Sequence, residues 1–321
     1  MTQVTPLVVL GAPSAIGIRP YDDGRPRRLD RAPAMLRAQR LIGRLGAQYL
    51  GEVAPPPYRD VERPASGVRN ERELDTYSHR LAARVGDVLA ASPRPFLLLL
   101  GGDCSILLGA LLGASRGGRR IGLAYVDAHA DFATPGEALT GSAASSALAM
   151  AVGRGDTPLA RLAGTHPLVQ SRDVALVARR DGHEPAYGHA ALATSPVRDL
   201  TANDLLARGP AWTAAAVLDR VAAPGVDGFW IHFDADVLDP AFMPAVDSPE
   251  PDGLGPDTAI ALLRPLVSHP RALGLQVTIY DPGLDADGTS ARRLVDLLCA
   301  VLDGAQPVPH AEDVDAVPAG A

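Results

Sequence analysis

Two short acidic motifs carry the strongest chemical signal in this sequence. Residues 127–131 read Asp-Ala-His-Ala-Asp and follow directly on the apolar run Ile121–Val126. Residues 232–236 read His-Phe-Asp-Ala-Asp and end another apolar run, Gly228–Phe233. Because side chains alternate along a strand, the histidine and both aspartates of the latter motif should share one face. Carboxylates combined with imidazoles are ligands that suit Mn²⁺, Zn²⁺ or Fe²⁺.

A single Asp-x-His at a turn is more often a cap or a turn residue than a metal ligand. Two acidic clusters change this balance, because unpaired carboxylates that lie close together repel one another and raise their pKa values. A divalent cation between them removes the repulsion. The sequence therefore predicts a metal site built from Asp127, His129, Asp131, Asp234 and Asp236.

Strands and helices alternate along the predicted chain. Near-continuous apolar runs, typical of strands covered on both faces, occur at Leu7–Leu10, Phe96–Leu100, Ile121–Val126, Val174–Ala178, Gly228–Phe233 and Leu273–Ile279. Helical patterns occur between or after them at Glu71–Ala91, Ala211–Ala222, Pro256–Val267 and Ser290–Leu302. This alternation indicates βαβ units around a parallel sheet. In such a sheet the ligand crevice lies outside the carboxyl ends of the strands, where both acidic motifs are expected.

Four segments resemble motifs of the ureohydrolase family, which includes arginases and agmatinases. Residues 127–131 are similar to the family's Asp-Ala-His-x-Asp, and residues 234–240 are similar to its Asp-x-Asp segment that runs on to Asp-Pro. A Gly-Gly-Asp-Cys-Ser segment resembles the family's Gly-Gly-Asp-His-Ser with one change. The similarity runs from about Val8 to Pro282, and its segments are residues 11–14, 101–105, 127–131 and 234–240, followed by Pro244 and Pro249.

The resemblance implies an α/β fold of three layers, with a central, mostly parallel β-sheet flanked by helices. We expect one arginase-like domain over residues 1–304. Residues 305–321, rich in proline, acidic residues and alanine, should form a disordered tail. The family is usually oligomeric, so the resemblance also implies a homo-oligomer.

The same resemblance implies a centre of two divalent metal ions, usually manganese. Asp127 and Asp234 would bridge the two ions. A metal-bridging hydroxide, which forms because metals lower the pKa of bound water, would attack the trigonal carbon of a C–N group. Asp131 would act as general base and then acid. His129 and Asp236 would complete one metal shell and Asp131 and residue 104 the other, so the metal set is Cys104, Asp127, His129, Asp131, Asp234 and Asp236.

Two departures from the family concern the metal centre itself. Cys104 stands where the family has a metal-binding histidine, and a thiolate ligand would favour Zn²⁺ or Fe²⁺ over Mn²⁺. The alternative is that Cys104 is only a small buried residue. His232 stands where the family has a small residue. It could be a replacement ligand, a proton shuttle, a hydrogen-bond donor that orients a carboxylate, or an ordinary buried histidine. We assign catalytic roles to Asp131 and His232.

Further departures concern the substrate. Ile279 occupies the position of a glutamate that holds the guanidinium, and Asp247 either compensates for it or serves as a turn residue. Ala133 and Ala144 stand where arginases carry an asparagine that holds the substrate carboxylate and a proton-shuttling histidine. We therefore expect a substrate other than plain arginine. The residues expected to contact it are Asp247, Ser248, Thr140 and His183.

These features predict a metal-dependent hydrolase of linear C–N bonds that acts on a guanidino or amidino compound. A second hypothesis keeps the metal centre but assigns a neutral amide, formyl or imine substrate, because the guanidinium-holding glutamate is missing. A third hypothesis is a degenerate family member that binds metal without catalysis. Its support is the combined change at Cys104, Ala144 and Ile279.

Composition excludes several other classes. The net charge of -7 argues against a nucleic-acid partner. The stretch from Arg25 to Arg31 is interrupted by Pro26, Leu29 and Asp30, and we interpret it as a solvated surface segment or a lid. No segment approaches the roughly 20 apolar residues of a membrane span. The N-terminus lacks a basic secretion signal, and the cysteines Cys104 and Cys299 indicate no disulfide framework. We expect a cytoplasmic protein whose partner is a small-molecule substrate.

Overall fold

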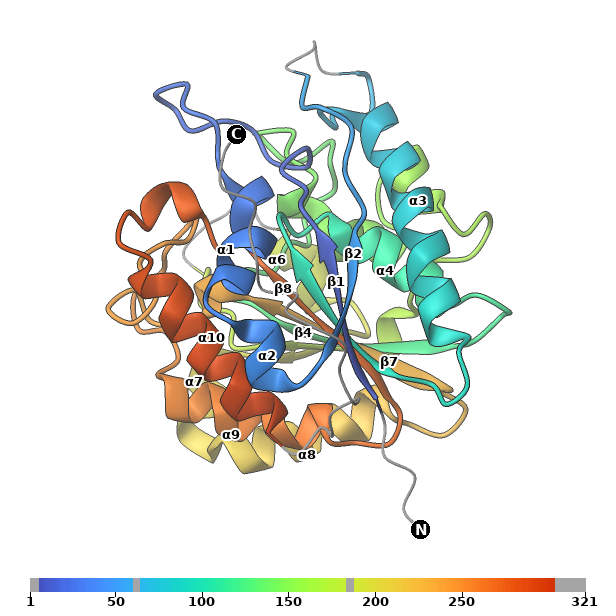
Figure 1. The fold of residues 1–321 in the computed structure, drawn as a ribbon. Coiled ribbons are helices and arrows are strands. Elements are labelled where there is room, and N and C mark those ends of the chain that lie inside the picture. Colours follow the sequence, from blue (N-terminus) through green and yellow to red (C-terminus); the bar gives the residue numbers. More distant parts are fainter. Residues whose placement is uncertain (1–5, 60–63, 183–187, 304–321) are drawn as a thin grey trace.

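A sheet of eight parallel strands forms the centre of the computed structural model, which describes residues 6–59, 64–182 and 188–303 (Figure 1). The strand order is β2-β1-β3-β8-β7-β4-β5-β6. All six predicted strands are confirmed, with differences only at their ends. The strands are β1 (Leu7–Ala12), β2 (Gln48–Glu52), β3 (Phe96–Gly101), β4 (Ile121–Val126), β5 (Val174–Val177), β6 (Arg198–Leu200), β7 (Gly228–Asp234) and β8 (Ala272–Thr278).

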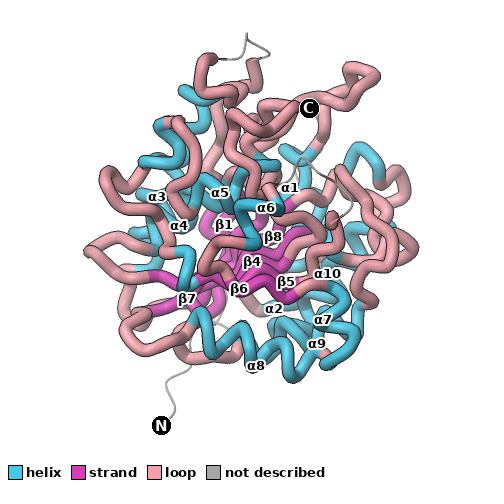
Figure 2. The backbone as a smooth tube through the Cα atoms, turned by 180° about the vertical axis from the view of Figure 1, so that it is seen from behind, coloured by secondary structure: helices cyan, strands magenta, loops and turns pink. Residues whose placement is uncertain are grey.

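Two groups of helices cover the sheet from opposite sides, which confirms the predicted three-layer α/β fold (Figures 1 and 2). One group contains α3 (Glu71–Leu89), α4 (Ile106–Ala114) and α5 (Ala147–Ala151). The other contains α1 (Ala32–Ala38), α2 (Leu41–Leu45), α7 (Ala202–Arg208), α8 (Pro210–Val221), α9 (Pro256–Val267) and α10 (Thr289–Leu302). A short helix, α6 (His189–Ala193), lies between β5 and β6 in the chain.

The central strands are buried on both faces, as their apolar sequences require. All six residues of β3 and all six of β4 are buried, and so are all seven of β7. In contrast, β2 is partly exposed at the sheet edge and carries polar residues. Because parallel strands need covering layers, this burial pattern fixes which strands lie in the middle of the sheet.

Strands β3, β8, β7 and β4 are consecutive in the sheet and parallel to one another. Their carboxyl ends therefore lie side by side, although the segments that follow them are far apart in the sequence. The segment after β3 carries Cys104, the one after β4 carries Asp127, and β7 ends at Asp234. The topology thus brings all three motif segments to one edge.

The turn after β3 is packed too tightly for any side chain at Gly102. A Cβ atom added there would lie 1.6 Å from the carbonyl oxygen of Ser14. Next to it, the buried carboxylate of Asp103 accepts hydrogen bonds from Ser14 Oγ at 3.1 Å and from the backbone N–H of Gly17 at 3.0 Å. It also accepts one from the N–H of Ser105 at 2.9 Å. These contacts join the loops after β1 and β3 and fix the position of Cys104 between them.

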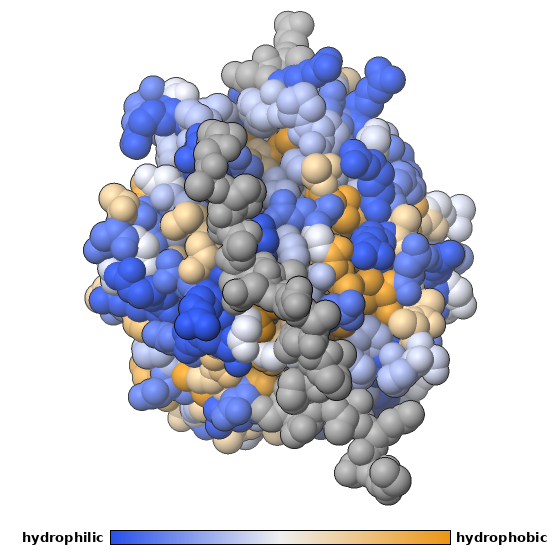
Figure 3. Space-filling model, in the orientation of Figure 1, coloured by the Kyte–Doolittle hydropathy of each residue, from blue (hydrophilic) through white to orange (hydrophobic). Residues whose placement is uncertain are grey.

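Hydrophilic residues cover most of the molecular face in Figure 3. No helix in the described part of the chain is both long and apolar enough to cross a membrane. The expected tail, residues 305–321, lies outside the described residues.

Candidate metal centre

In both acidic motifs the leading aspartate accepts a hydrogen bond from the backbone N–H two residues ahead. Asp127 follows its strand, and its Oδ1 accepts a hydrogen bond of 2.7 Å from the backbone N–H of His129. Asp234 does the same with the N–H of Asp236, at 2.9 Å. Aspartate commonly closes such turns onto the backbone two residues ahead. The turn explains the Asp-x-His and Asp-x-Asp spacing, and it leaves the other oxygen of each leading aspartate for further partners.

The strand ends bring potential metal ligands into two groups that share Asp127. One group is Asp127, His129 and Asp236, and the other is Cys104, Asp127, His232 and Asp234. Within each group, one ligand atom per residue lies within 4.8 Å of all the others. Nδ1 of His129 is 3.0 Å from Asp236 Oδ2 and 3.6 Å from Asp127 Oδ1. A carboxylate common to both groups is the arrangement expected of a residue that bridges two ions.

Cys104 faces the site rather than the apolar core. Its Sγ lies 2.8 Å from Asp234 Oδ2 and 3.6 Å from Thr278 Oγ1. Thr278, at the end of β8, also donates to Asp234 Oδ2 at 3.2 Å. Burial and the charge of Asp234 raise the pKa of the Cys104 thiol. Without a cation Cys104 is therefore a thiol that donates to Asp234, and a cation at this point would displace that proton.

The carboxylates of the site destabilise one another. Burial, together with the charges of Asp236 and Asp127, raises the pKa of Asp234 well above its ordinary value. Burial also raises the pKa of Asp236. In Asp127 the effect of burial is outweighed by the neighbouring imidazoles of His129 and His232, which hold its pKa low. Burial alone would lower the pKa of His129, but Asp236 and Asp127 raise it well above its ordinary value.

These residues fit a divalent cation. Oδ2 of Asp127 is buried and has no hydrogen-bond partner among the described residues, although both motifs converge on it. Buried carboxylates normally have their oxygens satisfied, and a bound cation is the simplest partner for an acidic cluster of this kind. The set of carboxylates, imidazole and thiol would accept Mn²⁺, Fe²⁺ or Zn²⁺.

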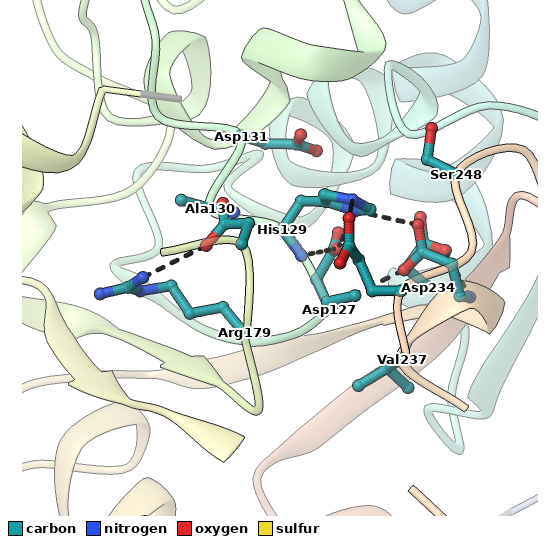
Figure 4. Close-up of polar contacts among 12 residues, drawn as sticks. Asp127, His129, Ala130, Asp131, Arg179, Asp234, Val237 and Ser248 are labelled. Carbon is teal, nitrogen blue, oxygen red and sulfur yellow. Dashed lines mark hydrogen bonds and ion pairs between the residues drawn. The ribbon is translucent and has the colours of Figure 1, made fainter. Parts of the chain in front are cut away.

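Asp131 belongs to neither group. Its Oδ2 accepts a short hydrogen bond of 2.5 Å from the hydroxyl of Tyr125 on β4. Figure 4 shows Asp131 set apart from Asp127 and Asp234, with no dashed contact to the residues drawn. Burial and the charge of Asp127 raise the pKa of Asp131 well above its ordinary value. Its ligation of a metal therefore stays a prediction, while its raised pKa and its position suit a residue that transfers protons.

A cavity of about 230 Å³ opens onto the centre. Of the residues predicted to contact substrate, Asp247, Ser248 and Thr140 line it, and His183 lies outside the described residues. Ile279 also lines the cavity, so an apolar side chain does lie at the position assigned to the missing glutamate. Other lining residues are Ile18, Arg19, Arg27, Cys104, Asp127, His129, Asp131, Ser142, Ala144, Ser145, Asp234 and Asp236.

Arg27 is a cavity residue that the sequence did not reveal. Its guanidinium donates to the carboxylate of Asp247 and to the carbonyl of Arg19, and it lies 4.2 Å from the ring centroid of Tyr21. Only 11% of the Arg27 side chain is exposed. Of the two interpretations of this arginine stretch, a solvated surface segment or a lid, the first is wrong for Arg27, because its side chain is buried and lines the cavity. The partner of Asp247 is thus a residue of the chain itself.

Comparisons with known proteins agree with this geometry. The chain matches the model of the Arginase family over residues 6–303. The arginase of Bacillus subtilis is 27% identical over 297 residues, which cover 90% of this chain and 97% of that protein. The native arginase structure from Bacillus caldovelox has a TM-score of 0.80 at 24% identity and covers 93% of this chain and 98% of its own. A formimidoylglutamase structure from Bacillus subtilis has a TM-score of 0.72 at 20% identity, covering 95% and 88%.

Proposed function

This chain belongs to the Arginase family and is a hydrolase of that family, and on this basis we propose that it cleaves a C–N bond of a guanidino or amidino compound other than plain arginine. The observation that carries the proposal is the pair of ligand groups that share Asp127 and open into one cavity. Cys104, Asp127, His129, Asp131, Asp234 and Asp236 would hold two divalent ions. When bound, such ions supply a water molecule of lowered pKa as the nucleophile.

The chain's own residues would handle the proton. Asp131 lines the cavity, and the Tyr125 hydroxyl holds one of its oxygens. A carboxyl group with a raised pKa can take up a proton from the attacking water and return it to the leaving amine near neutral pH. Ala144, which stands where arginases carry a proton-shuttling histidine, lines the cavity. Among the described residues, Asp131 is therefore the best candidate for the proton carrier.

The cavity favours a substrate that differs from plain arginine. Ile279 cannot accept a hydrogen bond from a guanidinium, and the carboxylate of Asp247 is paired with Arg27. Ser248, Thr140 and Ser142 line the wall and offer hydroxyl groups that could orient a neutral polar group. An acylated guanidino group, which carries less positive charge than the guanidinium of arginine, would fit these partners better.

The Arg27–Asp247 pair also favours a second candidate, a neutral formyl, amide or imine-type substrate. With Asp247 occupied and Ile279 apolar, no free carboxylate outside the metal groups and Asp131 lines the described cavity. One structural relative is named formimidoylglutamase, although at 20% identity this likeness supports only the fold.

The proposal extends to the setting of the enzyme. Manganese is the metal expected from the family, with zinc or iron favoured by Cys104. We expect a homo-oligomer in the cytoplasm that acts on a small molecule without a nucleic-acid or membrane partner. Light scattering on the purified protein and fractionation of the source cells would test the first two expectations.

Metal analysis followed by substrate screening tests the proposal. Protein purified without chelator should hold two metal ions per chain, and Asp127→Asn should lose both because Asp127 belongs to both ligand groups. Cys104→Ala should lose one ion, whereas Cys299→Ala, which removes the other free cysteine, should lose none. The loaded protein is then assayed for urea or amine release on a panel of guanidino, amidino, formyl and amide compounds that includes arginine. Absence of turnover on the whole panel would refute catalysis, and two-metal loading without turnover would favour the non-catalytic hypothesis.

A further inference from the structure

His232 lies at the centre of a buried polar row beneath the metal groups. It is paired in register with Gln276 on β8 and with Tyr125 on β4. Trp230 precedes it by two residues on β7 and therefore points to the same side of the sheet. All four side chains belong to fully buried residues. The described residues that line the cavity do not include His232, so it cannot touch a substrate there.

The hydrogen bonds of this row determine which ring nitrogen of His232 carries the proton. The indole N–H of Trp230, which can only donate, gives a bond of 2.8 Å to Gln276 Oε1. The amide nitrogen of Gln276 must then be the atom that lies 2.7 Å from His232 Nδ1. Because an amide nitrogen also only donates, Nδ1 of His232 must accept and carries no proton.

A neutral imidazole with a bare Nδ1 carries its single proton on Nε2. That nitrogen lies 3.4 Å from Oδ2 of Asp127, and neither of these two buried atoms has a hydrogen-bond partner elsewhere among the described residues. The N–H of His232 therefore lies beside the carboxylate that both ligand groups share. A protonated Nε2 has no lone pair to offer to a metal ion.

Coordination by His232 would require the opposite tautomer. The proton would move to Nδ1, and Gln276 would have to turn its amide so that Oε1 accepts from the ring. The indole N–H of Trp230 would then face the amide N–H₂, which leaves two buried donors against each other. Trp230 thus opposes coordination by His232 although the two side chains do not bond directly.

We propose that His232 is a positioning residue, fixed by Trp230 and Gln276 as a hydrogen-bond donor to Asp127, and not the fourth ligand of the Cys104 group. The ring of His232 also stacks on Tyr125, with centroids 4.1 Å apart and planes inclined by 11°. Tyr125 in turn holds Asp131. One buried aromatic pair therefore orients both the shared carboxylate and the proposed proton carrier. The inference rests on the proposed function only in that Asp127 binds metal.

The tautomer can be read by nitrogen NMR of protein labelled with ¹⁵N-histidine, with Zn²⁺ as the probe. His232→Asn identifies the signals of residue 232. We expect His232 to show a bare Nδ1 and a protonated Nε2 both without and with Zn²⁺, while a ring nitrogen of His129 shifts on zinc addition. Loss of the Nε2 proton of His232 on zinc addition would overturn the proposal.

The metal-free spectrum keeps this test separate from the proposed function. If no zinc binds and His129 does not respond, the proposed function fails, yet the tautomer of His232 can still be read. A metal-free His232 protonated at Nδ1 would overturn the inference even in a protein that binds two zinc ions.

Variants of the row provide an independent readout. Glu in place of Gln276 accepts from both Trp230 and His232, so Gln276→Glu should move the proton to Nδ1 and turn His232 into a zinc ligand. Trp230→Phe keeps the buried ring but removes the donor, and it should give a mixture of tautomers. Loss of a residue that orients a ligand commonly weakens metal binding about 10–100-fold. We expect that loss in His232→Leu and its partial rescue in His232→Gln, which retains an N–H donor. Equal zinc affinity of His232→Leu and wild type would contradict the positioning role.

Discussion

Replacing Arg27 by glutamine should both destabilise the protein and open its cavity to cations. Removing one partner of a buried ion pair costs about 3–5 kcal/mol, whereas an exposed pair contributes about 0–1 kcal/mol. The side chains of Arg27 and Asp247 are 11% and 12% exposed, so their pair lies nearer the buried limit. We take about 2–3 kcal/mol for the pair and about 0.5–1 kcal/mol for the cation–π contact with Tyr21. Arg27→Gln should therefore cost about 3 kcal/mol.

Asp247→Asn should cost less, because Arg27 then keeps the Arg19 carbonyl and the Tyr21 ring. Urea unfolding of wild type, both single variants and the double variant gives the coupling between the two side chains. We expect a coupling free energy of about 1.5–2 kcal/mol between Arg27 and Asp247. The slope of the unfolding free energy against urea concentration should be the same in all four proteins. A coupling below about 0.5 kcal/mol would mean that the two residues do not pair in solution, and the reasoning about the cavity would fail.

The same variants also test how the cavity selects its ligands. Arg27→Gln leaves the Asp247 carboxylate without its internal guanidinium, so an alkylguanidine should bind about tenfold more tightly than to wild type, a gain of about 1.4 kcal/mol. Calorimetry on the metal-loaded protein measures this directly, with Arg27→Gln/Asp247→Asn as the matched control that lacks the carboxylate. Equal binding to wild type and Arg27→Gln would show that Asp247 does not select substrates by charge.

Two further predictions concern the metal groups and the loop that carries Cys104. Burial and neighbouring carboxylates raise the pKa of Asp131 and Asp234 in the folded protein. The folded state is therefore destabilised as the pH rises from the pKa that these groups have in the unfolded chain to the pKa that they have in the folded protein. The raised pKa of His129 acts in the same direction. Calorimetry of protein treated with a chelator should therefore give a higher melting temperature at about pH 5 than at about pH 8. Metal-loaded protein should not melt at a higher temperature at the lower pH. Asp103→Asn should cost about 1–3 kcal/mol in urea unfolding, because it replaces one accepting oxygen by an N–H₂ group, which would face the backbone N–H of either Gly17 or Ser105. A stability equal to wild type in Asp103→Asn, or no pH difference between chelated and loaded protein, would contradict these two arguments.

The sequence predicted the central strands well because each is buried on both faces and reads as one apolar run. It did not reveal β2 or β6, which are the two edge strands of the sheet: β2 is polar and half-exposed, and β6 has three residues. Helix α4 was missed for the opposite reason. It is apolar almost all round and buried, so it lacks the alternation by which a surface helix is recognised.

The residues of the site also differ in how well the sequence predicts their position. Residues at or directly after a strand end, such as Asp127 and Asp234, could be placed because a parallel sheet gathers its carboxyl ends. Arg27 could not be placed, because its position depends on the path of a loop with no regular pattern. The tautomer of His232 depends on a cross-strand neighbour, Gln276, whose register with β7 is set only when the sheet assembles.

The changes at positions 104 and 232 make most sense when they are considered together. A metal-bound thiolate at Cys104 would add a negative charge where the resemblance places a neutral histidine ligand, in the same group as the carboxylates of Asp127 and Asp234. An N–H directed at Asp127 withdraws electron density from that carboxylate, and so it partly offsets the added charge. The imidazole absent from position 104 has thus not simply been replaced as a ligand from a neighbouring strand. On this reasoning the N–H of His232 would stabilise a buried metal centre that contains the Cys104 thiolate.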